Sequence, residues 1–411
     1  MRLCPWILDE LAVRTKGKTT AICGTNGKTT TNNILYSILT ANGKNVICNN
    51  AGANMLPGIV TAYIDGCSFF GKIKAEYVCL EIDEATATRA FDSIKPDYMI
   101  ITNFFRDQLD RYGEIDLTVD WLKRAIDKTP DTMMVLNCDD PLCVGLLENE
   151  QQKRCFFSIG EQLDLVLHET KESRFCVFCR HELKYNYYHY SQLGDYYCEH
   201  CGFARPKPDF MATNVNLDNY VQFDAIGLHI SAKLIGVHNV YNILAAISAA
   251  SMLGIDLTNI NDILAAYSTQ AGRMEEFAIQ GIPVILNLSK NPAGFNQVIT
   301  DMLRDPRKKD VVIIIHDNDQ DGTDVSWLWD VAFEELCIQG FSRFAASGER
   351  AEDVYLRLKY ADIDTRNIIF DKNIEAAIKS TLSYRNEVLY VLVNYTPLVE
   401  TRKALISLGG K

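Results

Sequence analysis

The chain has 411 residues, of which 47% are hydrophobic and 23% charged, and its formal net charge is −12. This composition excludes a disordered, collagenous or low-complexity protein, and at about 150 residues per domain the length predicts two or three domains. The acidic balance argues against capture of nucleic acid or an anionic membrane by the whole surface.

No apolar run reaches the ~18 residues that span a bilayer, and the amino-terminal segment lacks the apolar core of a signal peptide. The 13 cysteines are too dilute for a disulfide scaffold, and their number is odd. We therefore expect an intracellular protein whose thiols stay reduced.

Residues 19–150 alternate short apolar runs with helical patterns, which predicts a parallel sheet with crossover helices. A helix is expected over 29–41, ending at Asn42-Gly43. The expected strands are 19–23, 45–48, 77–82, 98–102 and 133–137.

A glycine-rich loop follows the first strand and opens the first helix: Gly24-Thr-Asn-Gly-Lys-Thr-Thr. In this context backbone N–H groups cradle phosphates, Lys28 reaches the β/γ oxygens and the Thr29 hydroxyl binds Mg²⁺. Ile22 stands where the common G-x-x-x-x-G-K-[ST] pattern has its first glycine. The alternative is a turn that only joins strand to helix.

Three acids stand at the end of the run YVCLEI and just after it: Glu81, Asp83 and Glu84. A metal beside a phosphate loop needs carboxylate help, and any of the three could supply it. If the strand continues, its alternation places Glu81 and Asp83 on one face and Glu84 on the other. The alternative is a group of solvated acids at a strand end.

Between about 170 and 208 the composition changes to Cys, His and Tyr, which indicates a small inserted module. Its spacing, C-x2-C, eighteen residues, C-x2-C, is typical of a tetrahedral Zn²⁺ site. Four thiolates leave no open position, so the zinc would be structural. A redox dithiol pair and unmetallated thiols are the alternatives. The expected ligands are Cys176, Cys179, Cys198 and Cys201.

After the insertion, 230–236 and 240–254 indicate a strand and a helix capped by Gly254, and another α/β unit starts near Gly272. Its expected buried strands are 283–287, 311–315, 343–347, 367–370 and 388–393. In such sheets ligands gather at the carboxyl ends of strands, here after 315 and 393.

Six motifs occur in the order found in Mur ligases, and the chain resembles that family over most of its length. The motifs are Gly24-Thr-Asn-Gly-Lys-Thr-Thr, Leu80-Glu-Ile, Thr102-Asn-Phe-Phe-Arg-Asp-Gln-Leu-Asp, Asn137-Cys-Asp-Asp-Pro, Gly236-Val-His-Asn-Val-Tyr-Asn and Gly272-Arg-Met-Glu. Mur ligases, like folylpolyglutamate synthases, use ATP to make an acyl phosphate from a carboxylate, which an amine then attacks.

The resemblance implies a Mur-ligase-like central ATPase domain over 1–271, with the zinc ribbon inserted at 172–208, and a Rossmann-like C-terminal α/β domain over 272–411. It implies that Thr29 and Glu81 hold Mg²⁺, Asn242 meets the adenine and Arg273 lies near the nucleotide. The implied ATP-binding residues are Thr25, Asn26, Gly27, Lys28, Thr29, Thr30, Asn242 and Arg273.

Two departures argue against addition of an amino acid. Gln108 stands where the amino-acid-adding ligases carry a metal-binding histidine, and a neutral amide binds a metal far less well. Asn287-Leu-Ser-Lys-Asn-Pro replaces Asp-Tyr-Ala-His-x-Pro, which removes the ribose-binding acid and offers Lys290 as a phosphate contact.

These departures, the four cysteines and the segment 317–327 resemble the MurT-type branch of the family. That branch implies amidation of the D-glutamate α-carboxyl of lipid II, with ammonia from a GatD-type glutaminase subunit whose site is completed by Asp324. Besides Asp324, the resemblance makes Lys28 and Glu81 catalytic. Asp324 alone could equally cap a helix, and the chain has no Gly-x-Cys-x-Gly elbow of its own.

Two other functions remain open: a ligase that adds an amino acid, and a zinc-ribbon NTPase that binds nucleic acid. The insertion interleaves Lys, Arg, Asp and Glu without a basic run, so we expect no nucleic-acid partner. Because the implied substrate is lipid-linked, we expect a cytoplasmic protein that acts at the inner face of the membrane.

Overall fold

The computed structural model describes residues 4, 6–106, 115–147, 151–165, 173–267, 271–338 and 340–409. The chain divides into two compact units, one of Met1–Phe105 and Glu114–Tyr267 and the other of Arg106–Gly113 and Ser268–Lys411. Within the described residues, no helix has both the length and the apolar character needed to cross a membrane.

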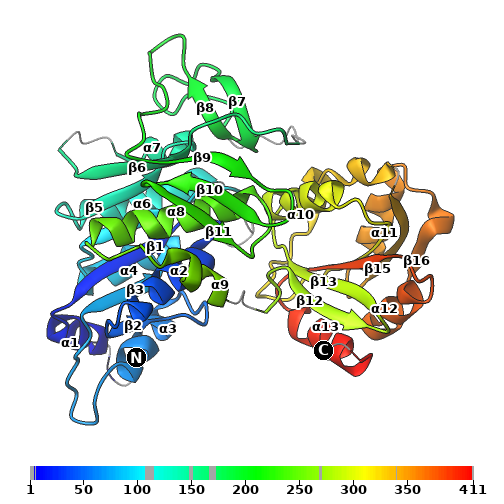
Figure 1. Ribbon diagram of the computed structural model, residues 1–411, viewed down its shortest axis with the longest axis horizontal. Helices are drawn as coiled ribbons and strands as arrows, with labels where there is room; N and C mark the ends of the chain where they lie inside the picture. Colours follow the sequence, from blue (N-terminus) through cyan, green and yellow to red (C-terminus); the bar gives the residue numbers. More distant parts are fainter. Residues whose placement is uncertain are drawn as a thin grey trace. The chain divides into compact units, whose positions relative to one another are not determined.

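The first unit is built on a nine-stranded sheet in the order β11-β10-β9-β6-β5-β4-β1-β3-β2 (Figure 1). From β9 along this order to β2, neighbouring strands pair in parallel, whereas β9 pairs with β10 and β10 with β11 in antiparallel fashion. The strands are β1 Lys18–Cys23, β2 Val46–Cys48, β3 Tyr77–Glu81, β4 Tyr98–Ile101, β5 Met133–Asn137, β6 Arg154–Ile159, β9 Phe210–Asn216, β10 Val221–Ala225 and β11 Leu228–Ala232.

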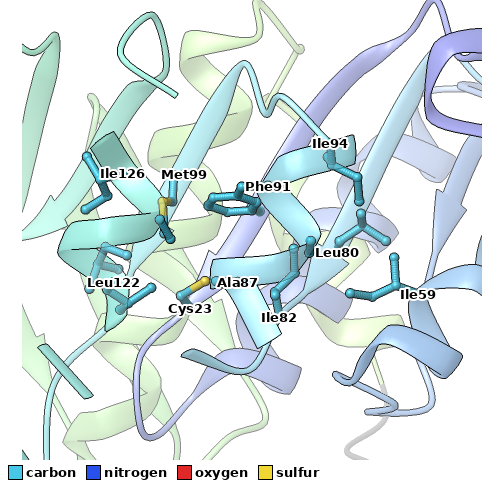
Figure 2. Packing of buried hydrophobic residues seen from close by; sticks show 14 of the residues in the cluster. Cys23, Ile59, Leu80, Ile82, Ala87, Phe91, Ile94, Met99, Leu122 and Ile126 are labelled. Atoms are coloured by element: carbon cyan, nitrogen blue, oxygen red, sulfur yellow. The ribbon is translucent and has the colours of Figure 1, made fainter. Parts of the chain in front are cut away.

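Helices cover both faces of this sheet. On one face α8 packs against α2, β5 and β6. On the other, α4 packs against α6 and on the alternate side chains of β1, β3 and β4, where Figure 2 shows Phe91 among Leu80, Ile94 and Met99. The helices are α1 Ile7–Arg14, α2 Lys28–Ala41, α3 Leu56–Asp65, α4 Glu84–Ser93, α6 Ile115–Asp127, α7 Pro141–Val144, α8 Val237–Met252 and α9 Ile260–Ala266.

The predicted alternation over 19–150 is confirmed, because β1 to β5 are parallel strands with helices between them. The predicted helix start after the glycine-rich loop and the stop at Gly254, which has a left-handed φ of 73°, are also observed. Strands β6, β9 and β10 were not predicted. β9 has one fully buried residue among seven, so its hydrophobic pattern is weak, and β10 alternates but is only five residues long.

A separate two-stranded hairpin, β7 Lys184–Tyr190 and β8 Leu193–Tyr197, occupies the cysteine-rich segment (Figure 1). Its own core is small and consists of Cys176, Leu183, Tyr196 and Cys198. The first residue of the predicted insertion, at 172, lies outside the described residues. A two-stranded hairpin is at best marginally stable in water by itself, so the module depends on other contacts.

The second unit has a six-stranded sheet in the order β12-β13-β17-β14-β15-β16, with one hydrophobic cluster on each face. All predicted strands are present, but the antiparallel edge strand β12 was not predicted. The elements are β12 Glu275–Ile279, β13 Ile282–Leu288, α10 Pro292–Arg304, β14 Lys309–Ile314, η1 Ser326–Asp330, η2 Phe333–Cys337, β15 Phe341–Ser347, α11 Ala351–Tyr360, η3 Thr365–Asn367, β16 Ile368–Phe370, α12 Ile374–Leu382, β17 Val388–Val393 and α13 Leu398–Ser407.

Candidate functional site

The glycine-rich loop is held in shape by the residues that follow β4. The Asn26 N–H donates to Asn103 Oδ1 at 2.9 Å, and the Thr102 hydroxyl donates to the Asn26 carbonyl at 2.7 Å. The Thr25 N–H donates to the Asn103 carbonyl at 2.8 Å, and the Thr25 hydroxyl exchanges hydrogen bonds with the backbone of Phe105. The loop is therefore preorganised by its neighbouring strand.

The loop delivers the chain directly into the amino terminus of α2. Gly27 precedes the helix with a left-handed φ of 85°, a conformation that favours glycine. The first intrahelical bond there runs from the Thr31 N–H to the Gly27 carbonyl, so the preceding N–H groups at 28–30 have no intrahelical acceptor. Such a terminus combines free donors with a positive dipole end and suits an anion.

Asn242 of α8 lies against this loop. A Cβ atom at Gly27 would fall 2.0 Å from Asn242 Oδ1, so no larger residue than glycine fits. The Asn242 side-chain amide donates to Asn239 Oδ1 at 3.0 Å, and the backbone carbonyl of Asn242 accepts from the Thr31 hydroxyl at 3.4 Å. The structure thus places Asn242 beside Gly27, and both residues belong to the predicted nucleotide site.

Lys28 is buried beneath the loop and paired with Glu84, not with Glu81. Its Nζ donates to the Gly24 carbonyl at 2.5 Å and to Glu84 Oε1 at 3.0 Å. The same Glu84 oxygen accepts from the Gly24 N–H at 2.8 Å. Burial by itself lowers the pKa of Lys28, but the carboxylates of Glu84, Asp83 and Glu81 raise it above its usual value. Lys28 is accordingly a fixed positive charge.

The strand does not continue past Glu81, which is why the predicted alternation of acids does not apply. Asp83 caps α4 by accepting from the Thr86 N–H at 3.2 Å, and Glu84 is the first residue of that helix. Glu84 is therefore a site residue that sequence reasoning left unassigned. Its position beside Lys28 depends on where β3 ends, which no local pattern fixes.

Glu81 faces the helix start from the end of β3. Its Oε1 accepts from the Asn54 amide at 3.1 Å, whereas its Oε2 is buried without a hydrogen-bond partner in the described structure. A Cβ atom at Gly52 would lie 3.8 Å from Thr29 Oγ1 and 4.0 Å from Glu81 Oε2, so both oxygens border one space. An unpartnered carboxylate oxygen beside a hydroxyl fits the oxygen ligands that Mg²⁺ prefers.

The four predicted cysteine ligands converge. Their Sγ atoms all lie within 4.8 Å of one another, with 3.6 Å between Cys176 and Cys201 and 3.4 Å between Cys179 and Cys198. A disulfide would need about 2.05 Å, while the edge of a Zn–S₄ tetrahedron with 2.3 Å bonds is about 3.8 Å. The backbone N–H of Cys201 lowers the pKa of Cys198 to about 6, which favours a thiolate there, whereas burial raises the pKa of Cys176. The His181 N–H lowers the pKa of Cys179, but burial and the neighbouring thiols raise it to about 12.

The histidines of this module have separate places. His181 and His200 stack at a ring distance of 3.6 Å beside Cys179, with which they form a second group of possible ligands. His189 is buried, and its ring nitrogens contact the Tyr241 hydroxyl at 2.6 Å and the Glu161 carbonyl at 2.8 Å. His189 is therefore part of a polar network.

That network joins the module to the large sheet. Asp139, which follows β5, accepts from the Tyr241 hydroxyl at 2.7 Å, from Ser158 at 2.7 Å and from Arg205 at 3.0 Å. Burial raises the pKa of Asp139, but the contacts with His189 and Arg205 lower it by more, so the net shift is downward. A buried carboxylate with this many donors stays charged and fixes the position of the module.

The turn of the hairpin also reaches the segment that holds the glycine-rich loop. The Gln192 amide donates to the Phe104 carbonyl at 2.5 Å, and the Tyr190 ring stacks on Phe105 with centroids 5.6 Å apart. Asp140 accepts from the Phe104 N–H at 2.7 Å. Because Phe105 bonds directly to Thr25, a short chain of contacts connects the hairpin with the loop.

In the second unit, the predicted nucleotide contact Arg273 is exposed. Asn287 holds the segment that contains Arg273, because Asn287 Oδ1 accepts from the Met274 N–H at 3.1 Å. The Asn287 amide group donates to the Ser289 hydroxyl at 2.9 Å. Lys290 follows and is half-buried. Gln108 lies outside the described residues.

Asp324 lies at the carboxyl-end side of β14, ahead of the 3-10 helix η1. Its Oδ1 accepts from the Ser326 N–H at 2.8 Å, and these bonds to Ser326 lower the pKa of Asp324. The residue at the cap position of η1 is Val325, so Asp324 forms a turn one residue earlier than a helix cap would. The same loop is tied to the end of β17, where the Thr396 N–H donates to Asp321 at 2.9 Å.

Comparison with known proteins gives two family matches. The Mur ligase middle domain matches residues 22–250 and the MurT ligase C-terminal domain matches residues 288–398. The chain is 35% identical over 378 residues to the lipid II isoglutaminyl synthase (glutamine-hydrolyzing) subunit MurT of Staphylococcus aureus (strain COL), covering 92% of this chain and 84% of that protein. Against the subunit of the same name from Streptococcus pneumoniae the identity is 34%, with 94% and 86% covered.

Solved structures share the fold at lower identity. A pseudomurein peptide ligase type C from Methanothermus fervidus superposes with a TM-score of 0.73 at 23% identity, covering 96% of this chain and 79% of that one. MurF from Acinetobacter baumannii gives a TM-score of 0.71 at 15% identity, with 98% and 78% covered. These likenesses establish the fold, an α/β Mur-ligase architecture with parallel sheets.

Proposed function

The chain belongs to the Mur ligase family, in the branch of the MurT subunits, and from this premise we propose that it is an ATP-dependent amidoligase subunit of peptidoglycan synthesis. Its acceptor would be the α-carboxyl group of the D-glutamate in lipid II, and its product the corresponding D-isoglutamine. The MurT proteins that it matches are named as subunits of lipid II isoglutaminyl synthase. Acting on a lipid-linked substrate places the protein at the cytoplasmic face of the membrane.

One observation carries the proposal: a preorganised loop, a fixed cation and an unpartnered carboxylate oxygen meet at the start of α2. The N–H groups at 28–30 and the Lys28 ammonium would hold the β- and γ-phosphates of ATP. Lys28 has three donor hydrogens and donates to the Gly24 carbonyl, to Glu84 and, at 3.5 Å, to the Thr25 carbonyl; exchange of this longest contact would let it bind a phosphate while it keeps Glu84. Thr29 and Glu81 would hold Mg²⁺, which neutralises phosphate charge as the γ-phosphoryl group is transferred.

In the proposed reaction the acceptor carboxylate attacks the γ-phosphorus and ADP leaves. Ammonia then attacks the carbonyl carbon of the acyl phosphate, the bond from that carbon to the phosphate oxygen breaks, and inorganic phosphate is released. The amide nitrogen loses one proton to water. The protein's part is alignment and charge stabilisation, in which Lys28 is the principal cation.

We further propose that Zn²⁺ binds Cys176, Cys179, Cys198 and Cys201 in a structural role. The Sγ positions suit a tetrahedron, and four thiolates leave no site for a substrate or water. Zinc would supply the stability that a hairpin with a four-residue core lacks.

The nitrogen would come from a GatD-type glutaminase subunit, with Asp324 completing the partner's catalytic site. Asp324 is half-buried in a loop tied to β17, and its charged form is favoured by Ser326. Asp324→Asn should abolish glutamine-dependent amidation of the complex while sparing amidation with added ammonium. Equal loss of both would assign Asp324 a structural role only.

The decisive experiment is mass spectrometry of a stem-peptide acceptor incubated with this chain, ATP, Mg²⁺ and ammonium, with and without a glutaminase subunit and glutamine. Conversion of a carboxylate to an amide supports the proposal. Addition of an amino-acid residue would instead identify an amino-acid-adding ligase. ATP hydrolysis stimulated by oligonucleotides, with no change in the acceptor, would point to the nucleic-acid-binding NTPase.

A further inference from the structure

Two aromatic side chains project from the first unit in the loop that joins α3 to β3. Phe69 is 99% exposed and Phe70 is 85% exposed, and their rings meet edge to face at 5.6 Å. Figure 1 shows this loop extending away from the sheet. Single exposed apolar residues are common, but two adjacent phenylalanines in open solvent at a loop tip indicate a contact with something else.

The tip is held by a defined turn. The Gly71 N–H donates to the Ser68 carbonyl at 2.8 Å, the Ser68 N–H donates to the Lys72 carbonyl at 2.9 Å, and Gly71 has a left-handed φ of 71°. At the base of the loop, Cys67 and Ile73 form a β-bridge and pack on the hydrophobic core. The phenylalanines are thus presented by an anchored loop, so their insertion into another phase would cost little ordering entropy.

The charges nearest the tip are positive. Residues 66–74 contain Lys72 and Lys74, both exposed, and no acidic residue, while the exposed acids Asp65 and Glu76 stand at the base of the loop. The guanidinium of Arg14, which is paired with Glu10 at 3.2 Å, also reaches the turn, because a Cβ atom at Gly71 would lie 2.9 Å from Arg14 Nη1. The chain as a whole carries −12, so an anionic surface would repel most of it and attract this loop.

We propose that the tip formed by Phe69 and Phe70, flanked by Lys72 and Lys74, docks on the surface of an anionic phospholipid bilayer. Aromatic rings would enter the interfacial layer while the lysines contact headgroup phosphates. Two rings and two lysines predict weak, reversible attachment, comparable to a single lipid chain. The inference deepens the proposed function, on which it rests for its biological purpose: the loop would bring the ligase to a lipid-linked acceptor.

The test is co-sedimentation of the full chain with vesicles of phosphatidylcholine alone and of phosphatidylcholine mixed with phosphatidylglycerol. We expect binding to the anionic vesicles, reduced about tenfold in Phe69→Gln/Phe70→Gln. Lys72→Gln/Lys74→Gln should lose the preference for anionic vesicles and the sensitivity to salt. As a matched control, Val399→Gln/Ile406→Gln changes two exposed apolar residues of α13 and should bind like the wild type.

Amidation assays separate this inference from the proposed function. The Phe69→Gln/Phe70→Gln variant should amidate a water-soluble acceptor as the wild type does, and lose rate only with a lipid-linked acceptor in vesicles. Vesicle binding that depends on the phenylalanines in a chain without ligase activity would sustain the docking and overturn the function. Equal binding by wild type and variant, or a change only in self-association or in partner binding, would overturn the docking.

Discussion

The glycine-rich loop and the four-cysteine module obtain their shapes in opposite ways. The loop is fixed by hydrogen bonds from Thr102 and Asn103, and it joins a strand and a helix that are buried in the large sheet. The module has a core of four buried residues and a two-stranded sheet, with its thiols gathered in one place. The loop is therefore shaped by protein before any ligand binds, whereas the module would be shaped by the ion it holds.

Because of this difference, mutations in the two regions should have different consequences. Damage to the loop should remove chemistry while the fold survives, and damage to the cysteines should remove local structure first. A change at the cysteines would reach the loop through the contacts of Gln192 and Tyr190 with Phe104 and Phe105. Perturbing each part in turn tests whether the two regions are as distinct as their contacts indicate.

The largest effect is expected for Lys28→Met. The variant should lose about 10²–10³-fold in amidation rate with ammonium or glutamine, because the fixed cation for the phosphates is gone. It should also lose about 3 kcal/mol of stability, since the buried Glu84 carboxylate loses its partner. Steady-state kinetics and urea unfolding measure the two losses.

The variant Lys28→Met/Glu84→Gln separates these losses, because it removes both charges of the pair. It should regain most of the stability while remaining inactive. Recovery of activity in this double variant would mean that Lys28 serves folding only and that the phosphates are held elsewhere.

A smaller effect on chemistry, but a larger one on local structure, is expected for Cys176→Ser/Cys201→Ser. The variant should bind no zinc by elemental analysis, and residues 173–205 should lose hydrogen-exchange protection, because structural zinc contributes folding free energy directly. ATP affinity should fall by no more than about tenfold, since the bonds from Thr102 and Asn103 remain.

Cys337→Ser is the matched control, as Cys337 is an exposed cysteine outside the cluster. It should leave zinc content unchanged. If the cluster variant binds no ATP at all, the loop is not built by its own contacts and the contrast between the two regions is wrong.

A still smaller effect is expected for Gln192→Ala, which cuts the hydrogen bond from the hairpin turn to the Phe104 carbonyl. A buried carbonyl left unpaired costs about 1–3 kcal/mol, part of which should appear as an increase of about fivefold in the dissociation constant for ATP by calorimetry. Asn186→Ala, which cuts an exposed bond to Asp195 in the same hairpin, should leave ATP binding unchanged. Equal effects of the two variants would argue against a connection through Phe104.

Much of this architecture could be predicted from the sequence, because its signals are local. The glycines and the lysine at 24–28 stand between a strand and a helix, and the cysteine spacing is the one typical of zinc knuckles. The strands of both parallel sheets are nearly continuous apolar runs, as buried strands must be. The motif Thr102-Asn-Phe-Phe was found by resemblance, and the structure supplies its reason, which is to hold the loop.

What could not be predicted depends on contacts between distant segments. Glu84 pairs with Lys28 across 56 positions of sequence because β3 ends at Glu81 and a helix begins. Asp139, His189 and Tyr241 come from three elements, and only the completed fold makes them neighbours. Strand β10 and the edge strand β12 take their place by antiparallel pairing, which a half-exposed sequence does not specify.

The last prediction concerns stability and its pH dependence at Asp140, which stands between the two regions. Burial raises the pKa of Asp140 to about 6, although the N–H groups of Phe104 and Leu142 and the Gln192 side chain favour its charged form. Between pH 3.8, the ordinary pKa, and about 6, the folded protein therefore binds more protons than the unfolded chain. The stability that Asp140 contributes is complete below this window and falls by about 3 kcal/mol as the pH rises through it.

Asp140→Asn removes that titration but keeps one oxygen to accept from Phe104 or Leu142. The variant should therefore be less stable than the wild type at pH 4, where the wild-type carboxyl is neutral, and should lose most of that deficit by pH 7. Urea unfolding at several pH values measures the difference, with the exposed Asp131→Asn as the control. A deficit that does not change with pH would mean that Asp140 is charged in the fold throughout, and that the hairpin and the phosphate loop meet across a solvated carboxylate.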